Sequence, residues 1–125
     1  MSEALFGALG TMAPLAGGWW PLRIPDGASL PAGTYQRISS VPVALAHDGG
    51  SDLMRRRYQL SVYSDRYLAG LTAARTIVET LNGVRTTWDG WTVTASIADD
   101  AEDIDPDPRG LFRQRIDVLL TSEAP

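Results

Sequence analysis

The chain has 125 residues, of which 44% are hydrophobic and 21% are charged, and its formal net charge is -4. This size is typical of one globular domain, residues 1–125, and the negative charge gives no overall field that would attract nucleic acid. With no cysteine and only one histidine, His47, the chain lacks the residues for disulfides, thiolate catalysis and the common zinc sites.

The first twenty residues are moderately apolar. Glu3 stands where a signal peptide requires a basic flank, and no apolar run reaches the roughly 20 residues of a membrane helix. We therefore expect neither an export signal nor a membrane partner. Ser2 is expected to cap a short helix with Leu5, Leu9 and Met12 on one face, which ends at the following proline and glycines.

Prolines and glycines dominate the next part of the chain and predict an irregular connection with one brief strand around residues 20–24. Residues 33–40 are expected to form a strand, and residues 41–52 an edge segment that runs into a flexible turn. This turn holds His47 and Asp48. A lone histidine in a turn is far more often a surface residue than a catalytic base, so we assign it no role.

Three consecutive arginines, Arg55, Arg56 and Arg57, begin a stretch in which apolar and polar residues alternate with the period of a half-buried strand. At this period Arg55 and Arg57 lie on the polar face. Arg56 lies on the core side, near the strand end, where its long stem can reach water. The triplet therefore forms no single basic patch, and we expect it to serve subunit contacts or local carboxylates and not to grip DNA.

A long helix is predicted from Ser64 or Asp65, either of which can cap it, to the Asn82–Gly83 terminus. Its buried face is predicted from positions at i, i+4, i+7, i+11 and i+14, which are Tyr67, Leu71, Ala74, Val78 and Leu81.

A two-stranded hairpin and a last strand are predicted after this helix. Asp89–Gly90, between two tryptophan-bearing arms, is typical of a two-residue hairpin turn. The tryptophan pairs can stack on bases or sugars, but such rings more often fill a core or an interface. The last strand carries one apolar face, interrupted only by Gln114, that consists of Phe112, Ile116, Val118 and Leu120.

An acidic segment of about a dozen residues, DDAEDIDPDPRG, is predicted as a polar connection between these strands, mobile in an isolated subunit. Its spacing does not fit a calcium loop: from Asp105, Gly110 falls in the sixth position, but Ile116 stands where the closing glutamate belongs. We predict a solvated acidic loop, with a weak cation site or a complementary protein surface as the alternatives.

The order of the predicted elements indicates an α+β domain. We expect an antiparallel sheet of about four to five strands, with the long helix and the short N-terminal helix packed on it. No nucleophile with its base, phosphate-binding loop or metal-ligand set is recognisable, so we expect no enzymatic activity and no cofactor.

Three segments carry a resemblance to a known family. They are YQRIS, an R-x-Q-x-x-V-Y strand that leads into an Ala-rich helix, and a closing D…GLFR…D segment that ends at Asp117. Together with the order of the elements over nearly the whole chain, they resemble the tail-completion, or tail-terminator, proteins of long-tailed bacteriophages and gene transfer agents. None of these segments is a catalytic signature.

The resemblance implies an α/β domain that assembles into a hexameric ring at the head-proximal end of the tail tube. The ring ends tube polymerisation and joins the tail to the head connector. The implied partners are further copies of the chain, the tail tube protein and a head–tail connector or adaptor protein, with DNA passing through the lumen without sequence-specific binding. The implied location is the tail–neck region of a virion or particle, reached by assembly in the host cytoplasm.

Charged residues are the expected subunit or partner interface, and the acidic segment is expected to face either the lumen or arginines of a neighbour. Two alternative functions stay open: a head–tail adaptor or minor tail component, and a small nucleic-acid-binding or regulatory module that uses the arginine triplet. The interface residues that we predict are Arg55, Arg57, Asp99, Asp100, Glu102, Asp103, Asp105, Asp107 and Arg109.

Overall fold

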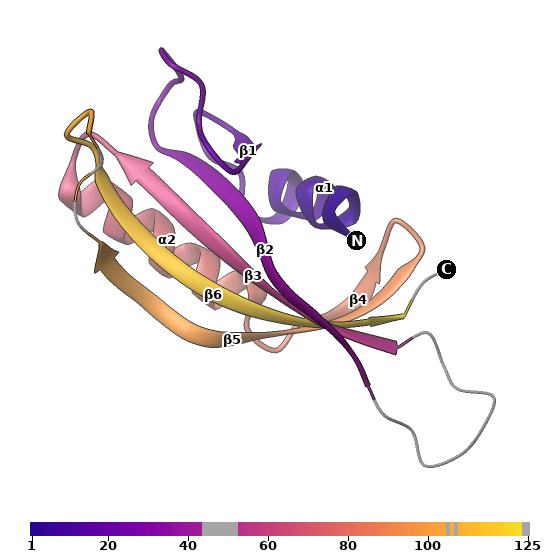
Figure 1. The fold of residues 1–125 in the computed structure, drawn as a ribbon. Helices are drawn as coiled ribbons and strands as arrows, with labels where there is room; N and C mark the ends of the chain where they lie inside the picture. Colours follow the sequence, from indigo (N-terminus) through magenta and orange to yellow (C-terminus); the bar gives the residue numbers. More distant parts are fainter. Residues whose placement is uncertain (44–52, 105, 107, 124–125) are drawn as a thin grey trace, which may run out of the picture.

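A computed structural model describes residues 1–43, 53–104, 106 and 108–123 of the chain (Figure 1). His47, Asp48 and their predicted turn lie outside the described residues, as do Asp105 and Asp107. The elements in chain order are α1 (Ser2–Met12), β1 (Trp19–Pro21), β2 (Ala32–Pro42), β3 (Leu53–Ser64), α2 (Tyr67–Leu81), β4 (Arg85–Trp88), β5 (Trp91–Ile104) and β6 (Phe112–Glu123).

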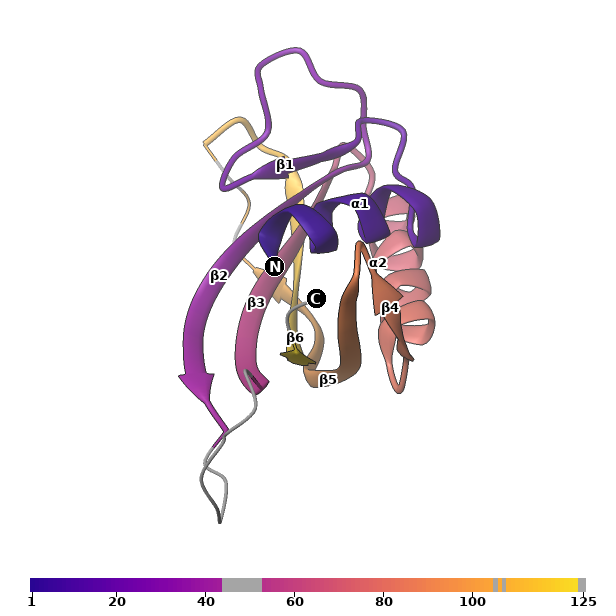
Figure 2. The same ribbon diagram turned by 90° about the vertical axis from the view of Figure 1, so that its right-hand side faces the viewer.

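The described strands form one curved sheet in the order β1-β2-β3-β6-β5-β4 (Figures 1 and 2). β1 is parallel to β2, and the other neighbouring strands are antiparallel. The predicted fold class, an α+β domain with four to five antiparallel strands and a long helix, is therefore wrong. The fold is mostly β, with a six-stranded mixed sheet that curls like half a barrel and two short helices.

Two features of the sheet explain this difference. β1 has only three residues, too few to show a period in the sequence, and its parallel pairing with β2 joins residues 19–21 to residues 33–35. β5 continues to Ile104 through the acidic segment, where we predicted a connection. Both features depend on pairing between distant parts of the chain, which local residue patterns do not report.

The core lies between the two helices and one face of the sheet. Leu5 and Leu9 of α1 and Leu81 of α2 are fully buried against the same cluster of strand residues. These strand residues alternate along each strand and pair across the sheet. They include Tyr58, Leu60 and Val62 of β3, Ile116, Val118 and Leu120 of β6, and Val93 and Ala95 of β5. The predicted apolar face of the last strand is thus confirmed for Ile116, Val118 and Leu120, whereas Phe112 at its start is exposed.

The buried face of α2 differs from the predicted one. Ala74 and Leu81 are buried as expected, but Ile77 is also buried, and Tyr67 is exposed at the start of the helix. The spacing rule centred the buried face near Val78, next to Ile77 in the sequence. Apolar residues occupy more than half of the helix circumference, so the spacing alone does not fix the centre of the buried face. The helix begins at Tyr67, and the Ser64 hydroxyl accepts a hydrogen bond of 3.1 Å from the backbone N–H of Arg66.

The predicted hairpin turn forms, whereas the predicted side-chain cap of α1 does not. The hairpin turn is confirmed: Asp89 and Gly90 have φ values of 49° and 82°, as a two-residue turn with two positive φ angles requires, and Trp88 pairs with Trp91. Ser2, in contrast, makes no side-chain cap of α1. Its hydroxyl lies 2.7 Å from the Tyr58 hydroxyl, so it ties the helix to the sheet.

Trp19 connects β1, β2 and the end of α1. Its side chain is buried, and its indole Nε1 donates a hydrogen bond of 2.8 Å to the backbone carbonyl of Ala13. Gly33 lies directly against the indole ring, where a Cβ atom would come within 2.5 Å of two ring carbons. A glycine at position 33 therefore lets the sheet approach the ring.

Candidate interaction surface

The acidic segment is a strand with two irregularities. The pairing of β5 with β6 shifts once between Ile97 and Asp99, and again between Asp99 and Glu102. Each shift adds one residue to β5 and reverses the face on which the following side chains lie. The first shift moves Asp99 to the face opposite the core, and the second restores the original phase, with Asp103 on the core face. The prediction of a loop is thus wrong for residues 99–104, which belong to β5. The predicted mobility of the segment in an isolated subunit stays a prediction.

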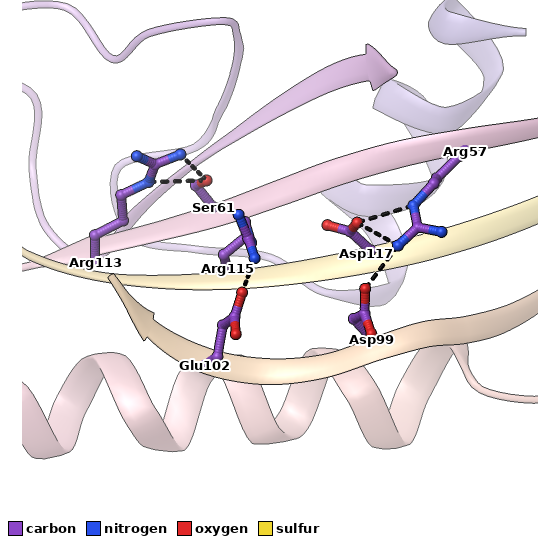
Figure 3. Close-up of polar contacts among 7 residues, drawn as sticks. All are labelled: Arg57, Ser61, Asp99, Glu102, Arg113, Arg115 and Asp117. Atoms are coloured by element: carbon purple, nitrogen blue, oxygen red, sulfur yellow. Dashed lines mark hydrogen bonds and ion pairs between the residues drawn. The ribbon is translucent and has the colours of Figure 1, made fainter. Parts of the chain in front are cut away.

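Arg57 links two carboxylates on the face of the sheet opposite the core (Figure 3). Its Nε donates a hydrogen bond of 2.9 Å to Oδ2 of Asp117, and its Nη2 lies 2.7 Å from the same oxygen and 2.6 Å from Oδ2 of Asp99. These contacts, led by the hydrogen bond with Asp117, raise the pKa of Arg57 above its usual value. The partners of Arg57 are therefore local carboxylates of the same chain, on β5 and β6.

Further contacts on this face continue the pattern toward the start of β6 (Figure 3). Arg115 forms an ion pair with Glu102 on β5. Arg113 donates two hydrogen bonds of 3.2 Å to the Ser61 hydroxyl on β3, and its guanidinium lies 5.7 Å from the centre of the Tyr63 ring. We refer to Arg57, Asp99, Glu102, Arg113, Arg115 and Asp117 as the charge ladder. Its charges are largely paired within one subunit.

Asp103 lies on the other side of β5 and anchors the strand to α2 and β6. Its carboxylate accepts hydrogen bonds from the Tyr67 hydroxyl, at 2.9 and 3.1 Å, and from the side-chain amide of the buried Gln114. The bond to Asp103 is the main reason that the pKa of Tyr67 is raised above its usual value. Gln114 interrupts the apolar face of β6 because it binds this carboxylate.

The remaining predicted interface residues are dispersed. Arg55 is exposed, and the exposed carboxylate of Asp100 accepts a hydrogen bond of 2.6 Å from the backbone N–H of Ala101. Arg109 lies 3.5 Å from Asp26, in a different part of the surface. Arg56 is on the core side as predicted, where it donates to the buried Ser122 hydroxyl at 3.0 Å and lies over the Trp91 ring. Whether the predicted residues contact another subunit stays a prediction.

Sequence reasoning missed three members of the charge ladder. Arg113, Arg115 and Asp117 occupy positions i, i+2 and i+4 of the last predicted strand, so strand period alone places them on one face. The same alternation that identified the apolar face of this strand therefore contained the signal for its charged face.

Asp117 should contribute more to stability than Asp99. The Asp117 side chain is 12% exposed and receives two of the three Arg57 contacts, whereas the Asp99 side chain is 60% exposed. Exposed ion pairs typically contribute about 0.2–1 kcal/mol, and salt screens them. In urea unfolding, Asp117→Asn should therefore lower the midpoint more than Asp99→Asn, and 1 M NaCl should reduce the effect of Asp99→Asn more strongly. Equal midpoints for the two variants would contradict the assigned roles.

An apolar groove of about 490 Å³ lies between α1 and β1. Its wall combines aromatic rings with small residues, and no charged side chain among the described residues lines it. We call this feature the α1 groove and define it by Phe6, Gly10, Leu15, Trp19, Trp20 and Tyr35. Phe6 and Tyr35 pack with their ring centres 5.9 Å apart, and Phe6 and Trp20 are exposed.

The described ranges, residues 1–43, 53–104, 106 and 108–123, contain neither a metal-binding cluster nor a membrane-spanning helix. No group of three or more histidine, aspartate or glutamate side chains is arranged there to hold a metal ion. None of the described helices has the length and apolar character needed to cross a membrane.

The sequence matches no family model and no curated protein. The structure, in contrast, is similar to that of a chain from the "Virion of native gene transfer agent (GTA) particle", with a TM-score of 0.62 and 15% sequence identity. The similarity covers 98% of this chain and 91% of that chain. It therefore extends over the whole fold, including the six-stranded sheet and both helices.

Proposed function

We propose that the chain is a structural protein of a tailed virion or gene transfer agent particle, and that it acts there as a tail terminator. Several copies, six in the simplest case, form a ring at the head-proximal end of the tail tube, stop tube polymerisation and join the tail to the head connector. The observation that carries this proposal is the likeness, over 98% of this chain, to a chain of a gene transfer agent virion.

Two further observations support a structural role. The family that the sequence segments resemble assembles into rings in the tails of such particles. In addition, Phe6 and Trp20 expose large apolar side chains that line one apolar groove, the α1 groove. Apolar side chains that gather on a surface are typical of contacts with other proteins.

The arginine triplet gives less support to the alternative function, a nucleic-acid-binding module. Arg57 is paired with Asp117 and Asp99, and Arg56 lies on the opposite face against Trp91 and Ser122. In the proposed ring, DNA passes through the lumen without sequence-specific contacts.

Native mass spectrometry tests the proposal. The purified chain is measured alone and mixed with the tail tube protein encoded by the same genome. We expect a closed oligomer, with a hexamer as the main species, in at least the mixture, and shorter tubes when the chain is added to polymerising tube protein. A chain that stays monomeric in both samples and leaves tube length unchanged is not a tail terminator.

A further inference from the structure

We propose that a pocket at one end of the sheet binds a carboxylate-bearing segment of a partner protein, and that Arg23 and Arg113 bind the carboxylate. The pocket has a volume of about 690 Å³ and lies where the connection after β1 meets the start of β6. This inference rests on the proposed function, since the partner is another protein of the particle. It adds the chemistry by which that partner is recognised.

Two segments far apart in the sequence form this pocket, which we call the arginine pocket. Residues 22–31 follow β1, residues 108–111 precede β6, and both lie at the same end of the sheet (Figures 1 and 2). An ion pair of 3.5 Å between Arg109 and Asp26 connects the two segments. We define the arginine pocket by Arg23, Asp26, Tyr63, Ile104, Arg109 and Arg113.

Arg113 has a fixed position but no carboxylate partner among the described residues. Its Nε and Nη2 donate to the Ser61 hydroxyl at 3.2 Å, and its guanidinium lies 5.7 Å from the centre of the Tyr63 ring. Its Nη1 takes no part in these bonds. The other two arginines of the charge ladder, Arg57 and Arg115, both pair with carboxylates. Because Arg113 is already ordered, it loses little side-chain entropy when it binds a carboxylate from another molecule.

Arg23 follows a strained turn. Leu22 has a φ of 67°, and the backbone N–H of Arg23 donates a hydrogen bond of 2.7 Å to the carbonyl of Pro21, which closes a three-residue γ-turn. A γ-turn with a positive central φ is rare and strained. The Leu22 side chain is 67% exposed, so its burial does not offset the strain. Within the described ranges Arg23 forms no ion pair, and a strained turn beside such a residue is typical of a binding site.

Asp26 competes only weakly with an incoming carboxylate. Its side chain is 86% exposed, and its distance of 3.5 Å from Nη1 of Arg109 is at the limit for a hydrogen bond. Exposed pairs of this kind are weak, because water and salt screen them. A carboxylate in the pocket would meet the forked donors of Arg23 and Arg113, which match its two oxygens.

The surroundings of the pocket favour a protein carboxylate over DNA. Tyr63 and Ile104 give the pocket apolar surface, on which the aliphatic stem of an acidic side chain and its apolar neighbours can be buried. A duplex, in contrast, presents a row of phosphates and binds to an extended basic face. Asp99 and Glu102 lie on the same face of the sheet as Arg113 and oppose such a row (Figure 3). The favoured partner segment therefore has acidic side chains next to apolar ones.

Peptide binding to the full chain tests the inference. The probe is an acetylated peptide in which glutamates alternate with leucines, titrated by calorimetry at low salt, and the control peptide has glutamine in place of every glutamate. We expect that the double variant Arg23→Gln, Arg113→Gln binds the acidic peptide about tenfold more weakly or worse. The variant Arg75→Gln, Arg85→Gln removes the same charge from exposed positions outside the pocket and should bind almost as well as the unchanged chain.

Three outcomes would overturn the inference: no binding of the acidic peptide by the unchanged chain, equal binding of the glutamine peptide, or equal losses in the two double variants. Arg23→Gln alone separates binding from folding, because this exposed side chain supports no contact of the fold. It should leave the unfolding temperature unchanged and still weaken binding of the acidic peptide severalfold.

A parallel titration with a short DNA duplex tests the class of partner. Duplex binding that is tighter than peptide binding, and that is lost in the Arg23→Gln, Arg113→Gln variant, would overturn the assignment to a protein carboxylate. The proposed function has its own test in the native mass of the unchanged chain. A ring that forms from a chain without peptide binding overturns this inference alone, whereas a chain that binds the peptide but never assembles contradicts the proposed function.

Discussion

Replacing Trp19 with alanine should lower the free energy of unfolding by about 3–5 kcal/mol, the typical loss for a buried tryptophan. The Trp19 side chain is 4% exposed, bonds the carbonyl of Ala13 and fills the space left by Gly33. Its removal opens a cavity between α1, β1 and β2 and leaves that carbonyl without its indole donor. Urea unfolding followed by far-UV circular dichroism measures the loss.

Trp20 provides the matched control for this prediction. It is the adjacent residue with the same side chain, but it is 39% exposed at the edge of the α1 groove. Trp20→Ala should therefore cost clearly less folding stability than Trp19→Ala. Equal losses for the two variants would mean that Trp19 does not connect the helix to the sheet.

Ile77 is expected to be a sensitive position of α2. It is 1% exposed and belongs to the core that the helix shares with β3, β5 and β6. Ile77→Ala should lower the free energy of unfolding by about 2–5 kcal/mol, as other buried isoleucine truncations do. The same unfolding measurement applies.

Leu71→Ala is the comparison for Ile77→Ala. The spacing of apolar residues predicts Leu71 as a buried position, whereas the structure gives it intermediate exposure. Its truncation should cost less than that of Ile77, because part of the removed side chain already contacts water. A larger loss for Leu71→Ala than for Ile77→Ala would restore the helix face predicted from the sequence.

Features that depend on neighbouring residues could be predicted from the sequence. The Asp89–Gly90 turn follows from the φ angles that these two residues tolerate, and it forms as expected. The division of Arg56 and Arg57 between two faces follows from the strand period, and their different partners agree with it. In each case the signal lies within a few residues of the feature.

Features that depend on distant residues could not be predicted. The acidic residues of β5 repel one another, and alone they indicate a solvated loop. They form a strand because Arg57 on β3, and Arg115 and Gln114 on β6, meet their carboxylates. The short parallel β1 is likewise defined by its pairing with β2 and by the burial of Trp19. As a result, the class of the fold was missed although most of its elements were located.

The two register shifts of β5 also bear on how this chain can be compared with distant relatives. Loss of the one extra residue between Ile97 and Asp99 would remove this irregularity and leave Asp99 opposite Asp117, on the same face as Arg57. A relative with a single deletion there would keep the ion pair, but an alignment without the gap would match its residues with ones that lie on the other face. At 15% identity, gap placement in this strand therefore decides whether an alignment pairs residues that share a face. Insertions and deletions in β5 carry more structural information than its substitutions.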